Sequence, residues 1–560
     1  MKNILSNKLY LYLTEFFAGV SVMAVELAAS RFMAPYFSSS QIVYTIIIGT
    51  VMIAMALGNL YGGRVADRKP DPSLLYRRML IASAWIAAIP LVGRYIVLAI
   101  SGVLVITINT NFLIIAAFAT CMIVFVYPLF LLGTVTPSLV RYIMDDANKS
   151  GEIVGRLGAC NTVGSIIGTF LPTFVTIPAV GTAATFIIFS SVLTIIALVY
   201  FISIKRITIS CIVCTLIVIL CAVFGGNASF AFWQKDMAYE GESVYNYLQV
   251  TEDSEKTVLS TNVLFGVQSV KMNEPGLTGM YYDYALAGPA MVIGSRCDAE
   301  AAGGTEDTAG QGNASDSEAA GGQGDKALDI LILGNGTGTF ATQCDTYYTG
   351  AHIDAVEIDD SISDLAYEYF DLSEAVNLST YDGRAYLQAI DNTYDVILVD
   401  AYQDITIPFQ MSSVEFFTLV RDHLKDDGVM IVNMNMHSDG EGSINQYLTD
   451  TIGYVFPNVA CADVAYNSNR ELFAGKDNTL FDSLQKACGA VENQELVIQL
   501  TKVYDELELC ETGNNILTDD KAPVEVLGMS MIDSLIQSEL AYYKDMYEEN
   551  GLDGLMNELL

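Results

Sequence analysis

Short apolar runs that end in glycines or in acids are the part of this sequence whose residue types could do chemistry. The run DILIL is followed by Gly334, Gly336 and Gly338, and glycines let the backbone approach a ligand that a Cβ atom would block. The next apolar run, HIDAV, closes on Glu357, whose carboxylate can accept hydrogen bonds from ribose hydroxyls. Strand, glycine turn, helix, strand and acid, in this order, are typical of a nucleotide-binding α/β half.

Further acids follow later apolar runs. Asp382 and Gly383 belong to the motif YDGR, where Asp382 could equally cap a helix that begins at Gly383. The run YDVILV ends on Asp400, at the strand terminus where ligands bind in open α/β sheets. A carboxylate there could hold an ammonium group and accept its proton, although an Asp can also simply cap the turn after a strand.

The histidines and cysteines form neither a metal pattern nor a hydrolase pattern. Only 3 histidines occur, and the 10 cysteines are scattered without zinc-ligand spacing. Cys211 and Cys214 form a CxxC, but they lie in an apolar stretch, where small thiols suit a helix in an apolar environment. We therefore expect no metal site, and a Ser-His-Asp hydrolase is poorly supported.

Charge divides the chain at Gly225. Residues 1–225 hold 14 Lys and Arg against 7 Asp and Glu, whereas the remaining residues hold 14 against 57. An acidic surface repels nucleic-acid phosphates and attracts cationic small molecules such as polyamines. The same acids could equally serve only to keep the domain in solution.

Residues 1–225 are predicted to form a multi-pass α-helical membrane domain, because runs of about twenty apolar residues can cross the hydrocarbon layer. Basic residues occur in alternate loops, which normally face the cytoplasm. An odd number of spans that begins on the cytoplasmic side would place the acidic half outside the cell. A nucleotide-type donor, however, is made in the cytosol. On that ground we expect a cell-membrane protein with a cytosolic soluble domain. About seven spans are expected, near residues 9–30, 41–61, 79–101, 111–136, 155–177, 182–204 and 207–225.

Two acids, Glu15 and Glu26, lie within the first predicted span. A charge there is costly and normally faces the protein interior. These acids could line a route for a cation, but pairing with a basic neighbour such as Arg31 or Arg94 is the favoured explanation.

The rest of the chain is predicted to contain a soluble enzyme domain and its appendages. Residues 226–294 indicate a small β-hairpin domain and a linking helix. Residues 295–326 lack apolar periodicity and are predicted to be a disordered acidic insertion. In residues 327–530, strands alternate with helices, which predicts a Rossmann-like α/β domain with a parallel sheet covered on both faces. Residues 531–560 are predicted to be an acidic helix.

The motifs GNGTG, VEID, YDGR, VDAY and YDYALAGPAM resemble those of the spermidine synthase (polyamine aminopropyltransferase) family. The resemblance implies a class I methyltransferase-like fold. The stretch ELAASRFMAPYF, Glu26–Phe37, and the loop GGRVADRK resemble bacterial proteins in which such a domain is fused to membrane spans. The implied reaction transfers an aminopropyl group from decarboxylated S-adenosylmethionine, a co-substrate rather than a permanently bound cofactor, to an amine such as putrescine.

The same resemblance implies roles for individual residues. Glu357 would hold the ribose of the donor. Asp382 and Gly383 would contact its adenine, with Gly334, Gly336 and Gly338 forming the turn beneath it. Asp400 would position and deprotonate the attacking amine. The amine pocket would be lined by Gln268, Tyr282 and Gln403.

Two departures from the family pattern remove carboxylates that bind amines. Thr337 stands where the family's glycine turn has an Asp, and Gln403 stands where a second acid follows the catalytic one. Asp519 and Asp520, in the stretch LTDDKAPVEVL, could replace this negative charge.

Other functions are left open by the sequence. An S-adenosylmethionine-dependent methyltransferase would use the same scaffold, and the loss of the acid at Thr337 favours it. A non-catalytic transporter or sensor would bind polyamine without turnover. The expected partners are a small cationic amine, the lipid membrane and a further copy of the chain in a homo-oligomer, but no nucleic acid.

Overall fold

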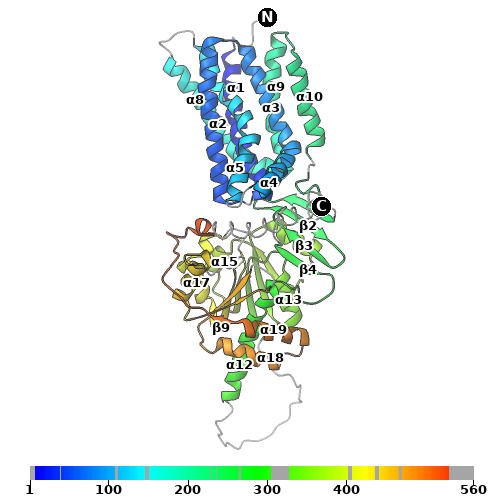
Figure 1. Cartoon of the computed structure of the whole chain (residues 1–560), viewed down its shortest axis with the longest axis vertical. Helices are drawn as coiled ribbons and strands as arrows, with labels where there is room; N and C mark the ends of the chain where they lie inside the picture. Colours follow the sequence, from blue (N-terminus) through cyan, green and yellow to red (C-terminus); the bar gives the residue numbers. More distant parts are fainter. Residues whose placement is uncertain are drawn as a thin grey trace, which may run out of the picture. The chain divides into compact units, whose positions relative to one another are not determined.

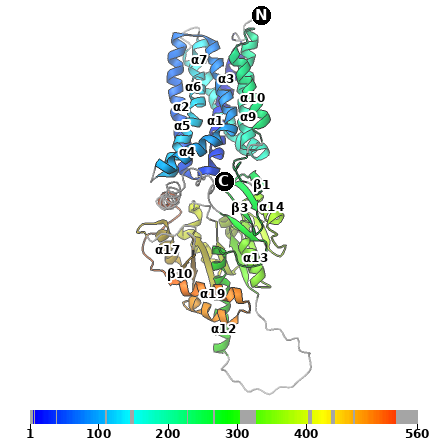
Figure 2. The ribbon, with the colours of Figure 1, turned by 45° about the vertical axis from the view of Figure 1, so that its right-hand side comes forward.

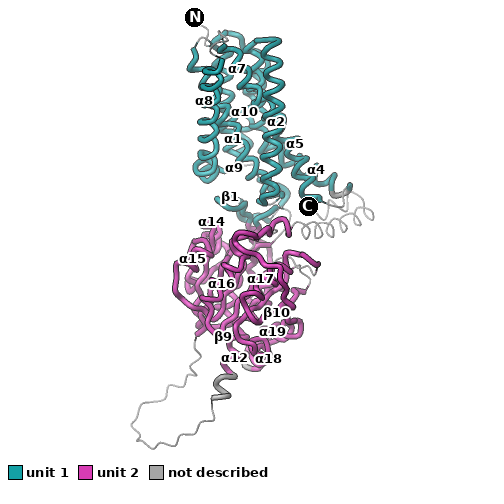
Figure 3. The backbone as a smooth tube through the Cα atoms, turned by 90° about the vertical axis from the view of Figure 1, so that its left-hand side faces the viewer, with its two compact units in different colours: residues 1–249, 261–265, 533–560 teal, residues 250–260, 266–532 magenta. Residues whose placement is uncertain are grey.

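A computed structural model of the chain describes residues 5, 7–37, 39–107, 111–144, 150–226, 229–234, 236–263, 267–303, 327–401, 407–434, 440–465 and 469–528. The chain divides into two compact units, which are coloured separately in Figure 3. Unit 1 comprises residues 1–249, 261–265 and 533–560, and unit 2 comprises residues 250–260 and 266–532. The helix predicted for residues 531–560 lies outside the described residues.

Unit 1 is mainly a bundle of apolar helices (Figure 1). Two short π-helical segments, Ile89–Gly93 and Pro172–Thr176, join α3 to α4 and α8 to α9. The helices are α1 (Lys8–Phe37), α2 (Gln41–Arg68), α3 (Pro72–Ala88), α4 (Arg94–Thr107), α5 (Phe112–Val124), α6 (Val126–Gly133), α7 (Val135–Ile143), α8 (Ser150–Leu171), α9 (Ile177–Ser203) and α10 (Ile209–Phe224).

Five helical stretches among the described residues are long and apolar enough to cross a membrane, and α5 and α10 are shorter apolar helices. The observed helical stretches therefore divide the apolar sequence differently from the predicted spans. Spans 155–177 and 182–204 fall in one helical stretch that bends at Gly181, whose φ is 79°. The predicted span 111–136 is divided at Phe125 between α5 and α6. The five stretches are Lys8–Phe37, Gln41–Arg68, Pro72–Leu104, Val126–Ile143 and Ser150–Ser203.

Glycines allow the helices of unit 1 to pack closely. A Cβ atom at Gly164 or Gly168 of α8 would collide with backbone carbonyl oxygens of α1. Small residues at helix contacts are typical of bundles in lipid, where close packing of backbones drives association. The outer faces expose large apolar side chains, among them Phe174 at 70% and Ile209 at 80% exposure, as suits a lipid environment.

Glu15 is fully buried in the bundle but does not pair with an arginine. Its Oε1 accepts hydrogen bonds from Oγ1 of Thr136 at 2.6 Å and from Nδ2 of Asn161 at 2.9 Å. Arg31 and Arg94 instead donate to backbone carbonyl oxygens. The predicted pairing of Glu15 with a basic neighbour is therefore wrong, because the donors bonded to its Oε1 are neutral side chains on α7 and α8, while its Oε2 is bonded to no described residue.

Basic residues gather at one end of the bundle. At one end the α2–α3 connection meets α7 and α9, where Arg141 pairs with Asp67 and the hydroxyls of Ser73 and Tyr200 are 3.0 Å apart. The N-terminus lies at this same end (Figure 2), whereas α10 runs toward the other. The helix ends and connections at the N-terminal end also hold Arg64, Arg68, Lys69, Arg77, Arg78, Arg156, Lys205 and Arg206.

Strands β1 (Met237–Glu242), β2 (Tyr247–Glu252), β3 (Lys256–Ser260) and β4 (Ser269–Met272) form a sheet in that order, so the predicted small sheet is present. Helices α11 (Tyr281–Ala285) and α12 (Ala287–Gly303) follow. Residues 295–303, which were assigned to the disordered insertion, are helical, because α12 continues through them. Residues 304–326 lie outside the described residues.

Unit 2 is built on an eight-stranded sheet of order β12-β10-β11-β9-β8-β5-β6-β7 (Figure 1). From β9 to β7 neighbouring strands are parallel, whereas β10, β11 and β12 are antiparallel to their neighbours. The prediction of a parallel sheet is therefore wrong at one edge, because the short β10–β11 connection leaves no room for a crossover. The strands are β5 (Asp329–Leu333), β6 (His352–Glu357), β7 (Asn377–Thr380), β8 (Tyr394–Val399), β9 (Leu424–Met434), β10 (Asn458–Asp463), β11 (Arg470–Gly475) and β12 (Glu508–Leu509).

Helices cover both faces of this sheet, as predicted: in Figure 1, α15 and α17 lie on one side of it and α13 and α19 on the other. Strand β8 is buried along its whole length, which explains its unbroken apolar run. The helices of unit 2 after β5 are α13 (Thr339–Tyr347), α14 (Asp360–Tyr369), α15 (Gly383–Ala389), α16 (Val414–Asp422), α17 (Ile444–Val455), α18 (Leu480–Ala490) and α19 (Gln494–Glu506).

The turn after β5 depends on its glycines. Gly334, Gly336 and Gly338 have φ angles of 90°, 54° and 91°, a region where other residues are strained. The N–H of Gly334 donates to the carbonyl oxygen of Val356 at 2.9 Å, which ties the turn to β6. A Cβ atom at Gly334 would collide with the carbonyl oxygen of Asp400, so the turn also lies against the end of β8.

We predict that Gly334→Ala destabilises unit 2 by about 2–4 kcal/mol, because a positive φ costs about 1–2 kcal/mol and the clash adds to that. Gly350→Ala is the matched control, since Gly350 has a φ of 87° but nothing within 4 Å of its Cβ position. Thermal unfolding of the full-length variants measures both losses. Equal losses would show that the close approach of the turn to β8 is unimportant.

Candidate active site

Several of the predicted site residues lie at the carboxyl ends of neighbouring parallel strands. Strands β8, β5, β6 and β7 are parallel neighbours, so their carboxyl ends lie side by side. Asp400 follows β8, the glycine turn follows β5, Glu357 ends β6, and Asp382 comes shortly after β7. The N–H of Tyr381 donates to the carbonyl oxygen of Glu357 at 2.9 Å, and this bond joins the end of β6 to the segment that holds Asp382. Ligands bind at this edge in open α/β sheets.

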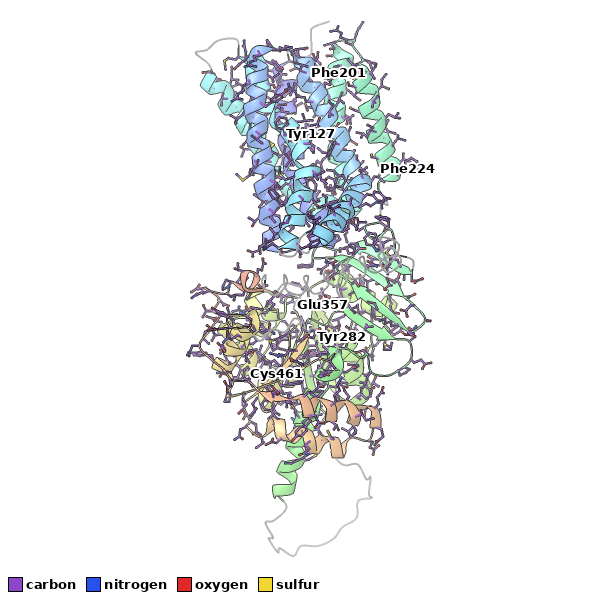
Figure 4. All side chains as sticks on the ribbon, viewed as in Figure 1. Tyr127, Phe201, Phe224, Tyr282, Glu357 and Cys461 are labelled. Atoms are coloured by element: carbon purple, nitrogen blue, oxygen red, sulfur yellow. The ribbon has the colours of Figure 1, made fainter. Side chains whose placement is uncertain are left out.

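Glu357 is buried and is hydrogen-bonded to the glycine turn. Its Oε2 accepts from the N–H of Gly336 at 2.8 Å, and its Oε1 accepts from the N–H of Asp359 at 3.1 Å. Burial raises the pKa of Glu357 to about 7, and these backbone donors oppose the rise. Each carboxylate oxygen keeps another lone pair, so the group can hold the turn and still accept bonds from hydroxyls. In Figure 4, Glu357 and Tyr282 lie toward the same end of unit 2.

Asp400 is held by donors from two other parts of unit 2. The hydroxyl of Tyr281, on α11, donates to Oδ2 at 2.9 Å, and Nδ2 of Asn433, on β9, donates to Oδ1 at 2.8 Å. Burial raises the pKa of Asp400 to about 7, although both donors favour the charged form. A carboxylate whose pKa lies near the working pH is suited to act as a general base.

Asp382 caps a helix. Its Oδ1 accepts from the N–H of Ala385 at 2.8 Å, and α15 begins at Gly383, so the capping role considered from the sequence is confirmed. The adenine contact of Asp382 and Gly383 stays a prediction, since a cap leaves other lone pairs of the carboxylate available.

Asp519 does not supply a free negative charge to the site. Nη2 of Arg384 is 2.6 Å from Oδ2 of Asp519, and the hydroxyl of Ser413 donates to Oδ1 of Asp519 at 2.6 Å. The guanidinium of Arg384 holds the pKa of Asp519 below its usual value. The hypothesis that Asp519 replaces the missing amine-binding acid is therefore not supported, because this charge is already neutralised.

The two neighbouring tyrosines of α11 have different partners. The hydroxyl of Tyr282 donates to the backbone carbonyl oxygen of Gln268 at 2.8 Å, whereas Tyr281 contacts Asp400. The two rings are 3.9 Å apart between centroids. Tyr282 therefore supports the segment that leads into β4, and its predicted neighbour Gln268 takes part through the main chain. Gln403 lies outside the described residues.

Two contacts of Asp400 were not anticipated from the sequence. Tyr281 directly precedes the tyrosine that was singled out, and Asn433 is a polar residue within the buried run GVMIVNM. A buried polar residue normally has a hydrogen-bonding partner, so Asn433 was the available signal. Thr337, which replaces the family's Asp, is 1% exposed, and no described residue is bonded to its hydroxyl.

A mixed sheet of this order, with a glycine turn after β5 and acids after β6 and β8, defines a class I methyltransferase-like, nucleoside-binding α/β domain. Among the described residues, no group of three or more His, Cys, Asp and Glu side chains could hold a metal ion. Residues 319–466 match the family model described as the spermine/spermidine synthase domain.

A probable polyamine aminopropyl transferase of Bifidobacterium longum is 47% identical over 376 residues, which cover 64% of this chain and 77% of the relative. The chain therefore belongs to the spermidine synthase family of polyamine aminopropyltransferases. The polyamine aminopropyltransferase of Vibrio vulnificus is 25% identical over 212 residues, 35% of this chain and 69% of the relative. A solved structure of a probable spermidine synthase from Corynebacterium glutamicum is 18% identical, with a TM-score of 0.36, over 53% of this chain and 95% of the other.

We predict that Tyr281→Phe shifts the rising limb of the pH profile of kcat/KM upward by about one pH unit. The Tyr281 hydroxyl favours ionised Asp400, so its loss raises the pKa of Asp400 above about 7. Tyr284→Phe is the matched control, because this tyrosine lies on the same helix but its hydroxyl donates to Oε2 of Glu506 at 3.0 Å. A profile that moves equally in both variants would contradict the role given to Tyr281.

Proposed function

We propose that this chain is a membrane-bound polyamine aminopropyltransferase that transfers the aminopropyl group of decarboxylated S-adenosylmethionine to a diamine such as putrescine. The observation that carries this proposal is the carboxylate of Asp400. It follows β8 beside the glycine turn, Tyr281 and Asn433 hold it in place, and its pKa is raised to about 7. Such a group can accept a proton from an ammonium at neutral pH.

The donor would lie over the glycine turn, toward β6 and β7. Glu357 would accept hydrogen bonds from the ribose hydroxyls with the lone pairs that the turn leaves free. Asp382 and Gly383 would contact the adenine at the start of α15. This placement directs the sulfonium toward the end of β8, where Asp400 lies.

The reaction is an in-line displacement at carbon. Asp400 takes the proton of the acceptor ammonium, and the nitrogen lone pair then attacks the aminopropyl carbon bonded to sulfur. The new C–N bond forms as the C–S bond breaks, and the bonding pair leaves with sulfur in neutral 5′-methylthioadenosine. Because the sulfonium is a good leaving group, the protein mainly has to align the partners and accept the proton. Association of the chain with a second copy stays a prediction.

We predict that Asp400→Asn lowers kcat by about 10²- to 10⁴-fold, the usual contribution of a general base. Mass spectrometry of products from full-length protein given decarboxylated S-adenosylmethionine and putrescine measures the loss. Asp364→Asn, at an exposed position of unit 2, removes the same charge and should leave the rate unchanged. Undiminished product from Asp400→Asn would refute the role of Asp400. Methylated amine formed with S-adenosylmethionine would support the methyltransferase alternative, and amine binding without product would support the sensor.

Membrane attachment is proposed from unit 1, whose five long apolar stretches expose large apolar side chains on their outer faces. The cytosolic origin of the donor favours a cytosolic catalytic unit. The basic residues, however, gather at the N-terminal end of the bundle, and such ends normally face the cytoplasm. Because the chain leaves α10 at the other end, the basic residues favour the opposite side for the segment after Gly225.

We predict that the protein sediments with membranes and resists extraction by carbonate, as a helical bundle in lipid does. Alkaline phosphatase and a fluorescent protein, each fused after Gly225, then read the side of the membrane. Fluorescence without phosphatase activity confirms the cytosolic placement. Phosphatase activity contradicts it and shows that the basic loops decide the orientation. Recovery of the full-length protein in the soluble fraction would overturn membrane attachment itself.

A further inference from the structure

Glu471 is a buried acid without a hydrogen-bonding partner in the described part of unit 2. It is the second residue of β11, its exposed fraction is 0%, and neither carboxylate oxygen is bonded to a described residue. A buried carboxylate is costly unless it is paired, so unpartnered ones are rare and call for an explanation. A cationic ligand could pair with such a carboxylate and supply the missing partner.

The position of Glu471 ties it to the candidate base. In the antiparallel β9–β11 ladder, Glu471 is directly opposite Asn433. Residues opposite each other in such a ladder project from the same face of the sheet, with Cβ atoms about 5 Å apart. Asn433 donates to Asp400 and accepts a hydrogen bond from Nδ2 of Asn469 at 2.8 Å. Asn469, two residues before Glu471, belongs to the same face.

The sheet order places Glu471 on the acceptor side of the site. Asp400 follows β8, the glycine turn and Glu357 lie on β5 and β6 to one side of it, and Glu471 lies on β11 beyond β9 on the other. A donor held by Glu357 therefore occupies the space on the far side of Asp400 from Glu471. The amine that attacks the donor has to approach from the opposite side, where Glu471 lies.

The charges of the site also favour a cationic ligand. Burial raises the pKa of Glu471 well above its usual value, and the nearby charge of Asp400 raises it further. An ammonium group between two carboxylates would reverse this effect, since it favours the ionised form of both. The sequence also lacks the amine-binding acids expected at Thr337 and Gln403, so the site needs a negative charge from elsewhere.

We propose that Glu471 is the second carboxylate of the acceptor site and binds the ammonium group of the polyamine together with Asp400. The proposal rests on the aminopropyl transfer proposed above. In this proposal β11 takes part directly in selecting a cationic acceptor. The sequence motifs assign that task to β8 and the segment that follows it. Asn433 orients Asp400 from β9, the strand between β8 and β11.

The test is Glu471→Gln in the full-length protein, which keeps the size of the side chain and removes its charge. The KM for putrescine should rise about 10- to 100-fold, as expected for the loss of a charged hydrogen bond. Binding of 5′-methylthioadenosine, measured by titration calorimetry, should change less than about twofold, because the nucleoside lies on the other side of Asp400. Glu374→Gln, at an exposed position of unit 2, is the matched control for charge and should leave both values unchanged.

Glu471→Leu is the second variant, and it should raise the KM for putrescine to a similar extent. The role of Glu471 can therefore be tested even if one of the two variants does not fold. A KM for putrescine within twofold of the unmodified protein would overturn the role of Glu471 while leaving the proposed function intact. An equal loss of 5′-methylthioadenosine binding would show a structural role and also overturn it. If the unmodified protein forms no product, the proposed function fails. Calorimetric binding of putrescine by the unmodified protein and by Glu471→Gln then decides the role of Glu471 separately.

Discussion

The site of this protein depends on keeping one carboxylate, that of Asp400, in a place largely removed from water. Burial disfavours its charge, and the hydroxyl of Tyr281 and the amide of Asn433 favour it. These opposing effects leave the pKa of Asp400 close to neutrality, which is where the proposed proton exchange with an amine would need it. The donors come from α11 and from β9, so the chemistry of Asp400 requires the folded sheet and the helix packed upon it.

The glycine turn meets a related constraint at the next strand. Its backbone has to pass close to the end of β8 and still bind the carboxylate of Glu357, and only residues without a Cβ atom allow both. Glu357 therefore shapes the turn before any ligand arrives. Under the proposed function, a group already fixed in this way would lose little freedom when it binds the donor.

Unit 1 meets the requirements of an apolar environment by other means. Its helices approach each other through glycines, and Oε1 of its buried acid Glu15 accepts hydrogen bonds from Thr136 and Asn161. The donors bonded to this acid are neutral side chains rather than an arginine. The basic residues gather instead at one end, a distribution that would orient the bundle in the membrane attachment proposed for it.

The sequence by itself determined which segments are apolar helices, where the glycine turn and the acids follow their strands, and which family the motifs resemble. These features are local, because a run of residues fixes its own period, turn and cap: Asp382 at the start of α15 is an example. Only the tertiary structure decided that β10 to β12 run antiparallel, that Tyr281 rather than Tyr282 contacts Asp400, and that Glu471 lies across a ladder from Asn433. These facts depend on strand order and register between segments far apart in the chain, and no local pattern specifies them.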